Sequence, residues 1–317
     1  MRASAALRNW FYGFKPPERG TIVLNHRRVY IVPTRMGWVF GATVAVLLVG
    51  SINYALQLGF GLTFLVAGMG LAGMVHTARN LGGLAIAPGR VEPVFAGEPA
   101  QFRLHFDNRS AHDRPAILSR QLASGSQIVT DVPARAAAEV VLAVPSQRRG
   151  WMPLERVMLE TRFPLGFFRA WSYIEPEQRA LVYPRPERAP LPPVSPDAEA
   201  GAARAQAAGN DDFSGLRAYQ PSDSPRHVAW KAVARAEKML TKQFTGESSA
   251  ELWLDWERMP GGLGVEARLS RLTGWVLEAE RAGVRYGLRL PGREIEPARG
   301  DEHRAQCLAA LALHNLA

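Results

Sequence analysis

The sequence holds a single cysteine, Cys307, among its 317 residues, so no disulfide can form within the chain. This is compatible with a reducing compartment. None of the seven histidines is spaced from another as in His-x-x-x-His, which argues against a zinc site built from them. The sequence also lacks a Walker A loop and a Gly-x-Ser-x-Gly nucleophile elbow. It therefore gives no signal for a P-loop nucleotidase or an α/β-hydrolase.

Charge is absent from Met36 to Val75. One membrane span needs about 20 residues, so this run predicts a transmembrane helical hairpin over residues 37–76. We expect one helix at about Gly37–Ser51, extending into Ile52, and a second at about Leu56–Val75. A buried hairpin of a soluble protein is the alternative, although soluble cores seldom run this long without a charge. A secretory signal peptide is excluded because the run begins late, is too long and has no small-residue cleavage site after it.

The charge-free run contains several closely spaced glycines. Gly68-x-Gly70-x-x-Gly73 has the spacing of a dinucleotide-binding loop, but no strand precedes it. We expect these glycines, with Gly37 and Gly41, to permit close helix packing instead.

Basic residues predict the orientation of the hairpin. Residues 1–36 form a basic segment before the first span, with one acid, Glu18, against Arg2, Arg8, Lys15, Arg19, Arg27, Arg28 and Arg35. The positive-inside rule then places both termini in the cytoplasm. The net charge of +9 suits an anionic partner. No recognised nucleic-acid fold accompanies it, so we expect the lipid bilayer and not nucleic acid.

Residues 84–183 have the pattern of an all-β, sandwich-like domain. Apolar and polar residues alternate over Gln101–Asp107, which is typical of a half-buried strand, and Asn108-Arg109-Ser110 supplies a turn. Val140–Val144 and Val157–Thr161 are further strand candidates. Frequent prolines exclude long helices here. Short strands at this spacing favour a small sandwich.

The rest of the chain divides into a Pro/Ala-rich linker at 184–209 and a region of α/β character at 210–317. The latter predicts a strand, a helix, a strand, a Pro-Gly turn and a helix, at Glu251–Trp256, Val265–Ala282, Val284–Leu290, Pro291-Gly292 and Arg304–Leu316. A strand, helix and strand in this order predict a parallel pair. Asp255 then lies at the carboxyl end of a strand, where open parallel sheets bind ligands.

The stretch from Asp212 to Phe244 mixes arginines, carboxylates, aromatics and prolines. We expect part of it to be an ion-paired structural motif made of Asp212, Gly215, Asp223 and Trp230. The other part fits an exposed protein-binding surface, made of Arg217, Tyr219, Arg226, Lys231, Arg235 and Lys238. We expect a helix from about Val228 through Lys242. Ser222, Asp223, Ser224 and His227 hold the residue types of a hydrolytic triad, but proximity in sequence is not geometry.

The motif from Asp212-Phe213-Ser214-Gly215-Leu216-Arg217-x-Tyr219 to Asp223-x-Pro225-Arg226-x-x-x-Trp230-Lys231-x-x-Ala234-Arg235 resembles the signature of the bacterial family called domain of unknown function 58. Arg149-Gly150-Trp151 and Thr161–Phe168 resemble the segment that precedes it in that family, and the resemblance covers about residues 37–317. Ser222 and Ala229 depart from it, since the family usually has Gly and a polar residue there.

The resemblance implies a multi-pass bacterial inner-membrane protein. It implies a MoxR-type AAA+ ATPase as partner, with a transglutaminase-like membrane protein as a further one. It also implies that the α/β region is a truncated von Willebrand factor A-like domain. The metal site of that fold reads Asp-x-Ser-x-Ser, and only Asp255 is retained here. We therefore expect no bound metal and no other cofactor.

The function that these observations favour is a non-enzymatic, membrane-anchored adaptor that presents a cytoplasmic module to the ATPase. A von Willebrand A-like ligand- or metal-binding module is the alternative. A hydrolase comes third, for lack of a motif.

Overall fold

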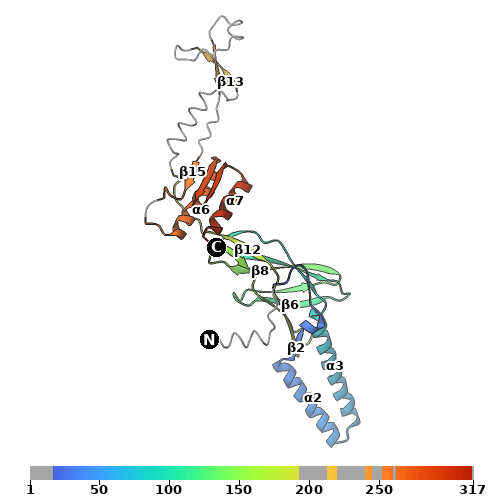
Figure 1. Cartoon of the computed structure of the whole chain (residues 1–317). Helices are drawn as coiled ribbons and strands as arrows, with labels where there is room; N and C mark the ends of the chain where they lie inside the picture. Colours follow the sequence, from blue (N-terminus) through green and yellow to red (C-terminus); the bar gives the residue numbers. More distant parts are fainter. Residues whose placement is uncertain (1–16, 193–212, 220–239, 245–251, 260–261, 316–317) are drawn as a thin grey trace. The chain divides into compact units, whose positions relative to one another are not determined.

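The computed structural model describes residues 17–192, 213–219, 240–244, 252–259 and 262–315 (Figure 1). The chain divides into two compact units, one ending at Tyr183 and the other beginning at Pro184. The first unit contains a helical hairpin and a β-rich domain, and the second contains the α/β region.

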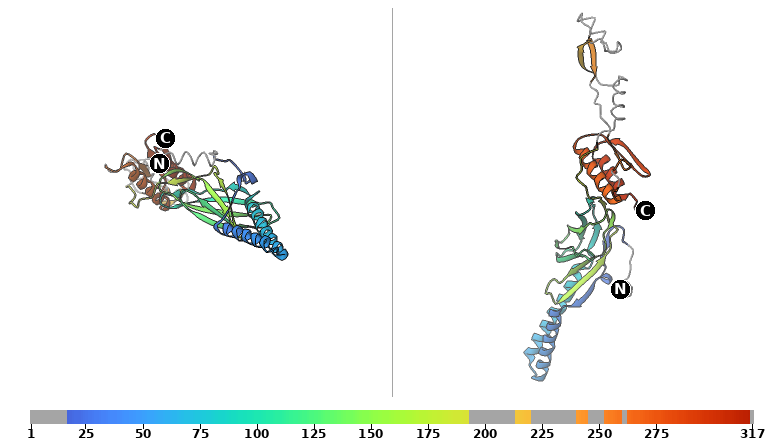
Figure 2. Two further views of the ribbon diagram at one scale, coloured as in Figure 1. Left: turned by 90° about the horizontal axis from the view of Figure 1, so that it is seen from below. Right: turned by 90° about the vertical axis from the view of Figure 1, so that its left-hand side faces the viewer.

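Two apolar helices form the hairpin, α2 at Arg35–Asn53 and α3 at Gln57–Leu81. Both are long and apolar enough to cross a membrane. Their large apolar side chains are exposed, such as Leu58 at 91% and Val46 at 71%, as lipid contact would require. Figures 1 and 2 show the two helices side by side, extending from the β-rich domain.

Helix α3 continues past the predicted end at Val75 because its last turns pack on the β-rich domain. Thr77, Asn80 and Leu81 are buried there. At about 1.5 Å per residue, the 25 residues of α3 span about 37 Å, more than the ~30 Å hydrocarbon core. The carboxyl-terminal turns of α3 therefore exceed the length that one span needs, and they pack on the domain.

The glycines of the hairpin differ in their surroundings. A Cβ at Gly70 would lie 2.6 Å from the ring of Phe40, so this glycine does permit close helix packing. Gly37 and Gly73 instead approach Phe167 and Leu165 of the β-rich domain. Gly41 and Gly68 have no neighbour within 4 Å of such a Cβ, so the packing role predicted for these two was wrong.

The β-rich domain consists of three sheets, mostly antiparallel. The first has the order β1-β3-β5-β8, made of Ile22–Val23, Ala85–Pro88, Pro99–Asn108 and Ala136–Pro145. The second has the order β2-β11-β10-β6-β7, made of Tyr30–Pro33, Phe168–Ile174, Val157–Thr161, Arg114–Gln121 and Gln127–Val132. The third has the order β4-β12-β9, made of Val94–Phe95, Arg179–Tyr183 and Gly150–Pro153.

The alternation predicted over residues 101–107 is confirmed in β5. Phe102, Leu104 and Phe106 are fully buried, while the residues between them are not. They belong to one core with Leu142 of the adjacent strand β8 and Leu159 of β10 in the second sheet. Burial of side chains of this size stabilises a domain by about 1.5–3 kcal/mol each.

The β-rich domain begins before the hairpin, which corrects the predicted boundaries at residues 36 and 84. β1 pairs with β3, and β2 pairs with β11 so that Tyr30 faces Trp171. These strands are short and lie among basic residues, so the sequence shows no alternating pattern there that would predict them. Residues 17–33 are therefore part of the domain, and the chain enters and leaves the hairpin from the same domain.

The second unit contains β15 (Leu252–Asp255), α6 (Val265–Arg281), β16 (Tyr286–Leu290), β17 (Arg293–Ala298) and α7 (Asp301–Leu313). β15 and β16 are parallel, as predicted. β17, which the sequence analysis missed, pairs antiparallel with β16 after the turn at Pro291-Gly292. α7 begins at Asp301, earlier than the predicted Arg304.

Part of the predicted linker packs on α6. The backbone N–H of Glu187 donates to the carbonyl of Ser270 at 2.9 Å, and the Trp275 indole donates to the carbonyl of Pro190 at 2.8 Å. Arg271 also pairs with the Glu187 carboxylate at 2.6 Å. The linker prediction was therefore wrong for residues 187–190, which are fixed by side chains of α6. Residues 193–209 lie outside the described part of the chain.

A separate two-stranded antiparallel sheet is formed by β13 (Phe213–Ala218) and β14 (Leu240–Phe244). Its register shifts between Phe213 and Gly215, as at a β-bulge, where glycine is common. The helix predicted through Lys242 was wrong for its last residues, because pairing with β13 places them in a strand.

Candidate functional site

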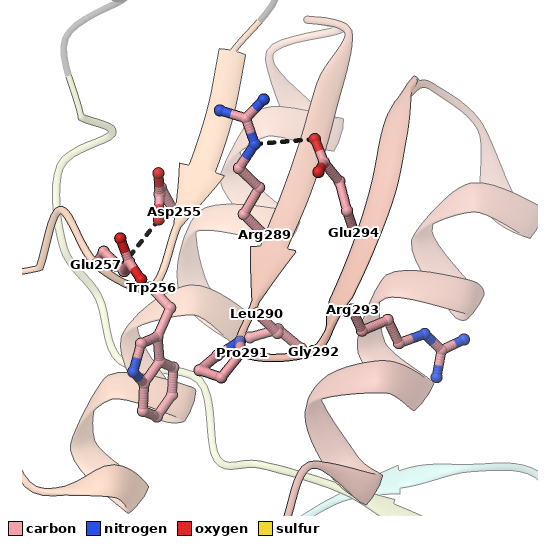
Figure 3. A pocket seen from close by; sticks show the side chains of 9 residues that line it. All are labelled: Asp255, Trp256, Glu257, Arg289, Leu290, Pro291, Gly292, Arg293 and Glu294. Carbon is pink, nitrogen blue, oxygen red and sulfur yellow. Dashed lines mark hydrogen bonds and ion pairs between the residues drawn. The ribbon is translucent and has the colours of Figure 1, made fainter.

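The candidate site is a cavity of about 630 Å³ at the carboxyl end of β15 and β16 (Figure 3). Asp255 ends β15 and pairs in register with Arg289 of β16. The turn at Pro291-Gly292 and the start of β17 complete the lining. Parallel strands of a sheet end on one edge, which is why the strand-end residues meet here.

Both carboxylate oxygens of Asp255 contact residues that follow it directly in the chain. Its Oδ1 accepts the backbone N–H of Glu257 at 2.9 Å, and its Oδ2 lies 3.8 Å from Nε of Arg258. Its side chain is 15% exposed. Both oxygens therefore hold the turn that follows β15.

Arg289 is fixed between two neighbours. Its Nε donates to Oε1 of Glu294 at 2.9 Å, drawn as a dashed line in Figure 3. Its guanidinium carbon lies 3.9 Å from the ring centre of Trp253, a cation–π distance. Gly287 makes room for that ring, since a Cβ there would lie 2.7 Å from it. The guanidinium is thus held in place at the side of the cavity.

The charges of the lining set what the cavity can do. The lining holds the three carboxylates of Asp255, Glu257 and Glu294. It also holds the two guanidinium groups of Arg289 and Arg293. No serine, cysteine or histidine lies among its lining residues. The arrangement suits recognition of a polar ligand, and it offers no nucleophile paired with a base.

Aligned on Asp255, the two serine positions of Asp-x-Ser-x-Ser are Glu257 and the buried Met259. The residues between them are engaged in packing and an ion pair. The Trp256 ring centre lies 5.1 Å from that of His314, and the Arg268 guanidinium lies 5.3 Å from the Trp256 ring. Arg258 pairs with Asp255. Within the described residues, no three His, Cys, Asp or Glu side chains are grouped as a metal site would need.

Cys307 and His303 form the one described contact between a thiol and an imidazole, at 3.6 Å. Burial raises the pKa of the Cys307 thiol to about 12, so it stays protonated at neutral pH. Nε2 of His303 also lies 2.7 Å from the Tyr286 carbonyl, which can only accept a hydrogen bond. Nε2 therefore carries a proton and cannot act as a base toward the thiol. This pair is a core contact.

The predicted motif residues fall mostly outside the described part of the chain. Arg217 lies on β13 opposite Thr241, Gly215 lies at the register shift, and Tyr219 follows the strand and is half-buried. The others, which lie outside the described residues, are Asp212, Asp223, Arg226, Trp230, Lys231, Arg235 and Lys238.

Sequence reasoning found Asp255 but missed the rest of the cavity. The lining residues Arg289 and Glu294 lie on β16 and β17, and only the sheet brings them beside Asp255 of β15. The alternation of Glu294, Ile295 and Glu296 after a Pro-Gly turn was the signal that could have revealed β17.

A scan against protein-family models gives no match, and neither does a search of curated proteins.

Proposed function

We propose that this chain is a membrane-anchored, non-enzymatic adaptor that presents a cytoplasmic module to a MoxR-type AAA+ ATPase. The resemblance of the motif at residues 212–235 supports the partner. The observation that carries the anchoring role is the direct joining of the apolar hairpin to the β-rich domain. A transglutaminase-like membrane protein is proposed as a further partner.

The joint between hairpin and domain contains buried and partly buried polar contacts. The Thr34 hydroxyl caps α2 by accepting the N–H of Gly37 at 3.1 Å, and it donates to the carbonyl of Gly166 at 2.7 Å. The Asn80 amide of α3 donates to the Thr161 hydroxyl at 2.8 Å. These contacts hold both helices in a fixed direction, which suits a protein that displays a domain at a set position above the bilayer.

A stacked pair of rings adds to the joint. The rings of Phe40 in α2 and Phe167 lie 4.2 Å apart. Aromatic pairs of this kind contribute about 0.5–1.5 kcal/mol beyond their buried area. Hydrogen bonds and a stacked aromatic pair therefore both connect the hairpin to the domain.

We further propose that both termini are cytoplasmic at a bacterial inner membrane. Strands from both sides of the hairpin share a sheet, as β2 does with β11, so both sides lie on one face of the membrane. The basic residues before α2 favour the cytoplasmic face. A reporter that is active only in the cytoplasm, fused after Ala317, should be active. A reporter that is active only in the periplasm should be silent there, and a signal from it would contradict the proposal.

The proposed docking surface is the basic segment that includes Arg235 and Lys238. The double change Arg235→Glu and Lys238→Glu is expected to abolish capture of the ATPase by the full-length chain from detergent extracts. Reversal of two charges at an interface makes a repulsive contact. The melting temperature should stay nearly unchanged, since surface substitutions usually cost within about 0.5 kcal/mol. Immunoblotting of the captured ATPase measures the effect.

The matched control is Arg90→Glu with Arg148→Glu, two exposed arginines of the β-rich domain. It makes the same change of charge and should capture the ATPase normally. If the Arg235 and Lys238 variant folds and still captures the partner, the docking proposal is wrong and the β-rich domain becomes the better candidate surface.

The cavity beside Asp255 favours a second candidate, a ligand-binding module in a truncated von Willebrand A-like domain. Its position at the carboxyl end of parallel strands is where such sheets bind ligands. The lining favours a polar organic ligand over a metal ion, because Asp255 is already bonded to the turn after β15. A hydrolase is the weaker alternative.

A further inference from the structure

A second cavity, of about 220 Å³, lies where α3 ends on the β-rich domain. It is distinct from the cavity beside Asp255. Its lining is rich in cationic and imidazole side chains, with one carboxylate and one aromatic ring. The side chains that matter are His26, His76, His112, Arg79, Arg114, Asp113 and Phe163.

Arg114 is the central feature of this cavity, since it is only 5% exposed. Its Nε donates to Oδ1 of Asn108 at 2.7 Å, and its Nη1 donates to the carbonyls of Arg79 and Asn80 at 3.0 and 2.8 Å. Among the described residues it has no ion pair with a carboxylate within 4.0 Å, and its Nη2 makes no hydrogen bond. Burial lowers the pKa of Arg114, and the charge of Arg79 lowers that pKa further.

A buried cation beside a second cation is costly unless negative charge balances it. The last carbonyls of α3 supply only about half a negative charge. Asp113 lines the cavity, but its Oδ1 accepts the backbone N–H of Ala134 at 2.8 Å. Two guanidinium groups therefore outweigh the one carboxylate of the lining, and three imidazoles add polar nitrogens. The cavity is arranged for an anion.

The cavity lies at the level of the membrane surface if the hairpin spans the bilayer. His76 directly follows the charge-free run that ends at Val75. Phe163, which lines the cavity, is 41% exposed. Nearby Leu165 packs over Gly73, where a Cβ would lie 3.1 Å from its methyl group. In a hairpin that spans the bilayer, these apolar side chains would lie at the hydrocarbon edge. The cavity would then face the headgroup layer, where cationic pockets bind lipid phosphates.

The chain also leaves space for an imidazole in this cavity. A Cβ at Gly82 would lie 2.9 Å from Nδ1 of His26, so the glycine after α3 lets the ring approach the helix end. A neutral imidazole still has one N–H to donate. His26 therefore adds a donor to those of Arg79 and Arg114.

We propose that this cavity binds a phosphate group, supplied by the headgroup of an anionic phospholipid or by free phosphate. The inference rests on the proposed membrane insertion of the hairpin and not on the adaptor role. Arg114 provides its free Nη2, and Arg79 provides a second guanidinium at the exposed rim. Two guanidinium groups are well suited to phosphate, because their planar N–H donors match its oxygens.

The test uses the full-length chain in micelles of a neutral detergent with equal amounts of phosphatidylglycerol and phosphatidylcholine. Native mass spectrometry counts the lipids that stay bound. The wild type should retain more phosphatidylglycerol than phosphatidylcholine. Arg79→Gln with His112→Gln should retain phosphatidylglycerol about tenfold less, because neutral amides replace the guanidinium charge of Arg79 and the imidazole of His112. The control Arg90→Gln with His105→Gln removes the same residue types from exposed positions outside the cavity and should behave as wild type.

A second arm titrates inorganic phosphate into the same protein with phosphatidylcholine alone. A rise in melting temperature that the cavity variant lacks, without preferential retention of phosphatidylglycerol, would assign the cavity to free phosphate. The proposal is overturned if neither lipid nor phosphate binds, or if the cavity variant binds both as wild type does. Should the double variant fail to fold, the single change at exposed Arg79 answers the same question.

Membrane fractionation separates the two proposals. A chain that is not recovered with membranes would contradict the proposed anchoring. A chain that is recovered with membranes but binds no phosphate would contradict only this inference.

Discussion

Gly274→Ala is expected to lower the free energy of unfolding of the α/β unit by about 3 kcal/mol. The new Cβ would lie well inside the van der Waals contact distance of the carbonyl oxygen of Glu187. The oxygen belongs to the backbone and the position of a Cβ is fixed by its own backbone, so a rotamer change cannot relieve the clash. Alanine gains about 1 kcal/mol over glycine in helix propensity, but overpacking dominates, because the segment that holds Glu187 must move away from α6.

That movement would break specific contacts. The hydrogen bond from Glu187 to the Ser270 carbonyl and the indole bond of Trp275 to Pro190 both depend on the present spacing. Hydrogen–deuterium exchange of the peptide over residues 265–281, together with thermal unfolding of the full-length chain, measures the loss. Faster exchange and a lower melting temperature are expected.

Gly264→Ala is the matched control. Gly264 precedes α6, has φ of −65°, and has no neighbour within 4 Å of an added Cβ. Alanine there should change the melting temperature little. Equal behaviour of the two variants would show that the segment at Glu187 is not packed on α6 in solution.

Asn108→Ala is expected to destabilise the β-rich domain by about 3–4 kcal/mol. Asn108 is fully buried, and its amide nitrogen donates to the carbonyls of His112, Val132 and Pro133 at 2.8, 3.2 and 2.9 Å. Its Oδ1 accepts from Nε of Arg114 at 2.7 Å. Truncation leaves buried groups without partners, including an N–H of a buried cation, and each costs about 1–3 kcal/mol.

The neighbouring change Asp107→Ala provides the comparison. Asp107 pairs only at the surface, with Arg109, whose side chain is 79% exposed. Surface pairs of this kind contribute about 0–1 kcal/mol. Thermal unfolding in detergent should therefore show a large drop for Asn108→Ala and almost none for Asp107→Ala. A small drop in both would mean that the contacts around Arg114 do not stabilise the domain.

The sequence by itself determined the features that depend on local pattern. The charge-free run from Met36 to Val75 determined two apolar helices, since burial in lipid or protein is the only low-energy state for such a run. Strict alternation determined β5, and the Pro-Gly turn determined the end of β16. The local pattern of the strand predicted at Glu251–Trp256 placed Asp255 near a strand end. Each of these follows from neighbours within a few residues.

Only the tertiary structure decided which distant segments meet. Tyr30 faces Trp171 across a strand pair, and the hairpin interrupts the domain between them. Arg289 joins Asp255 at one cavity, and Arg114 reaches the end of α3 at another. Partner choice in a sheet and burial of a charge depend on contacts far apart in the chain, and no local periodicity records them. That is why the sequence showed the helices, several strands and one site residue. The two cavities come from packing within each unit, one in the α/β unit and one in the β-rich domain.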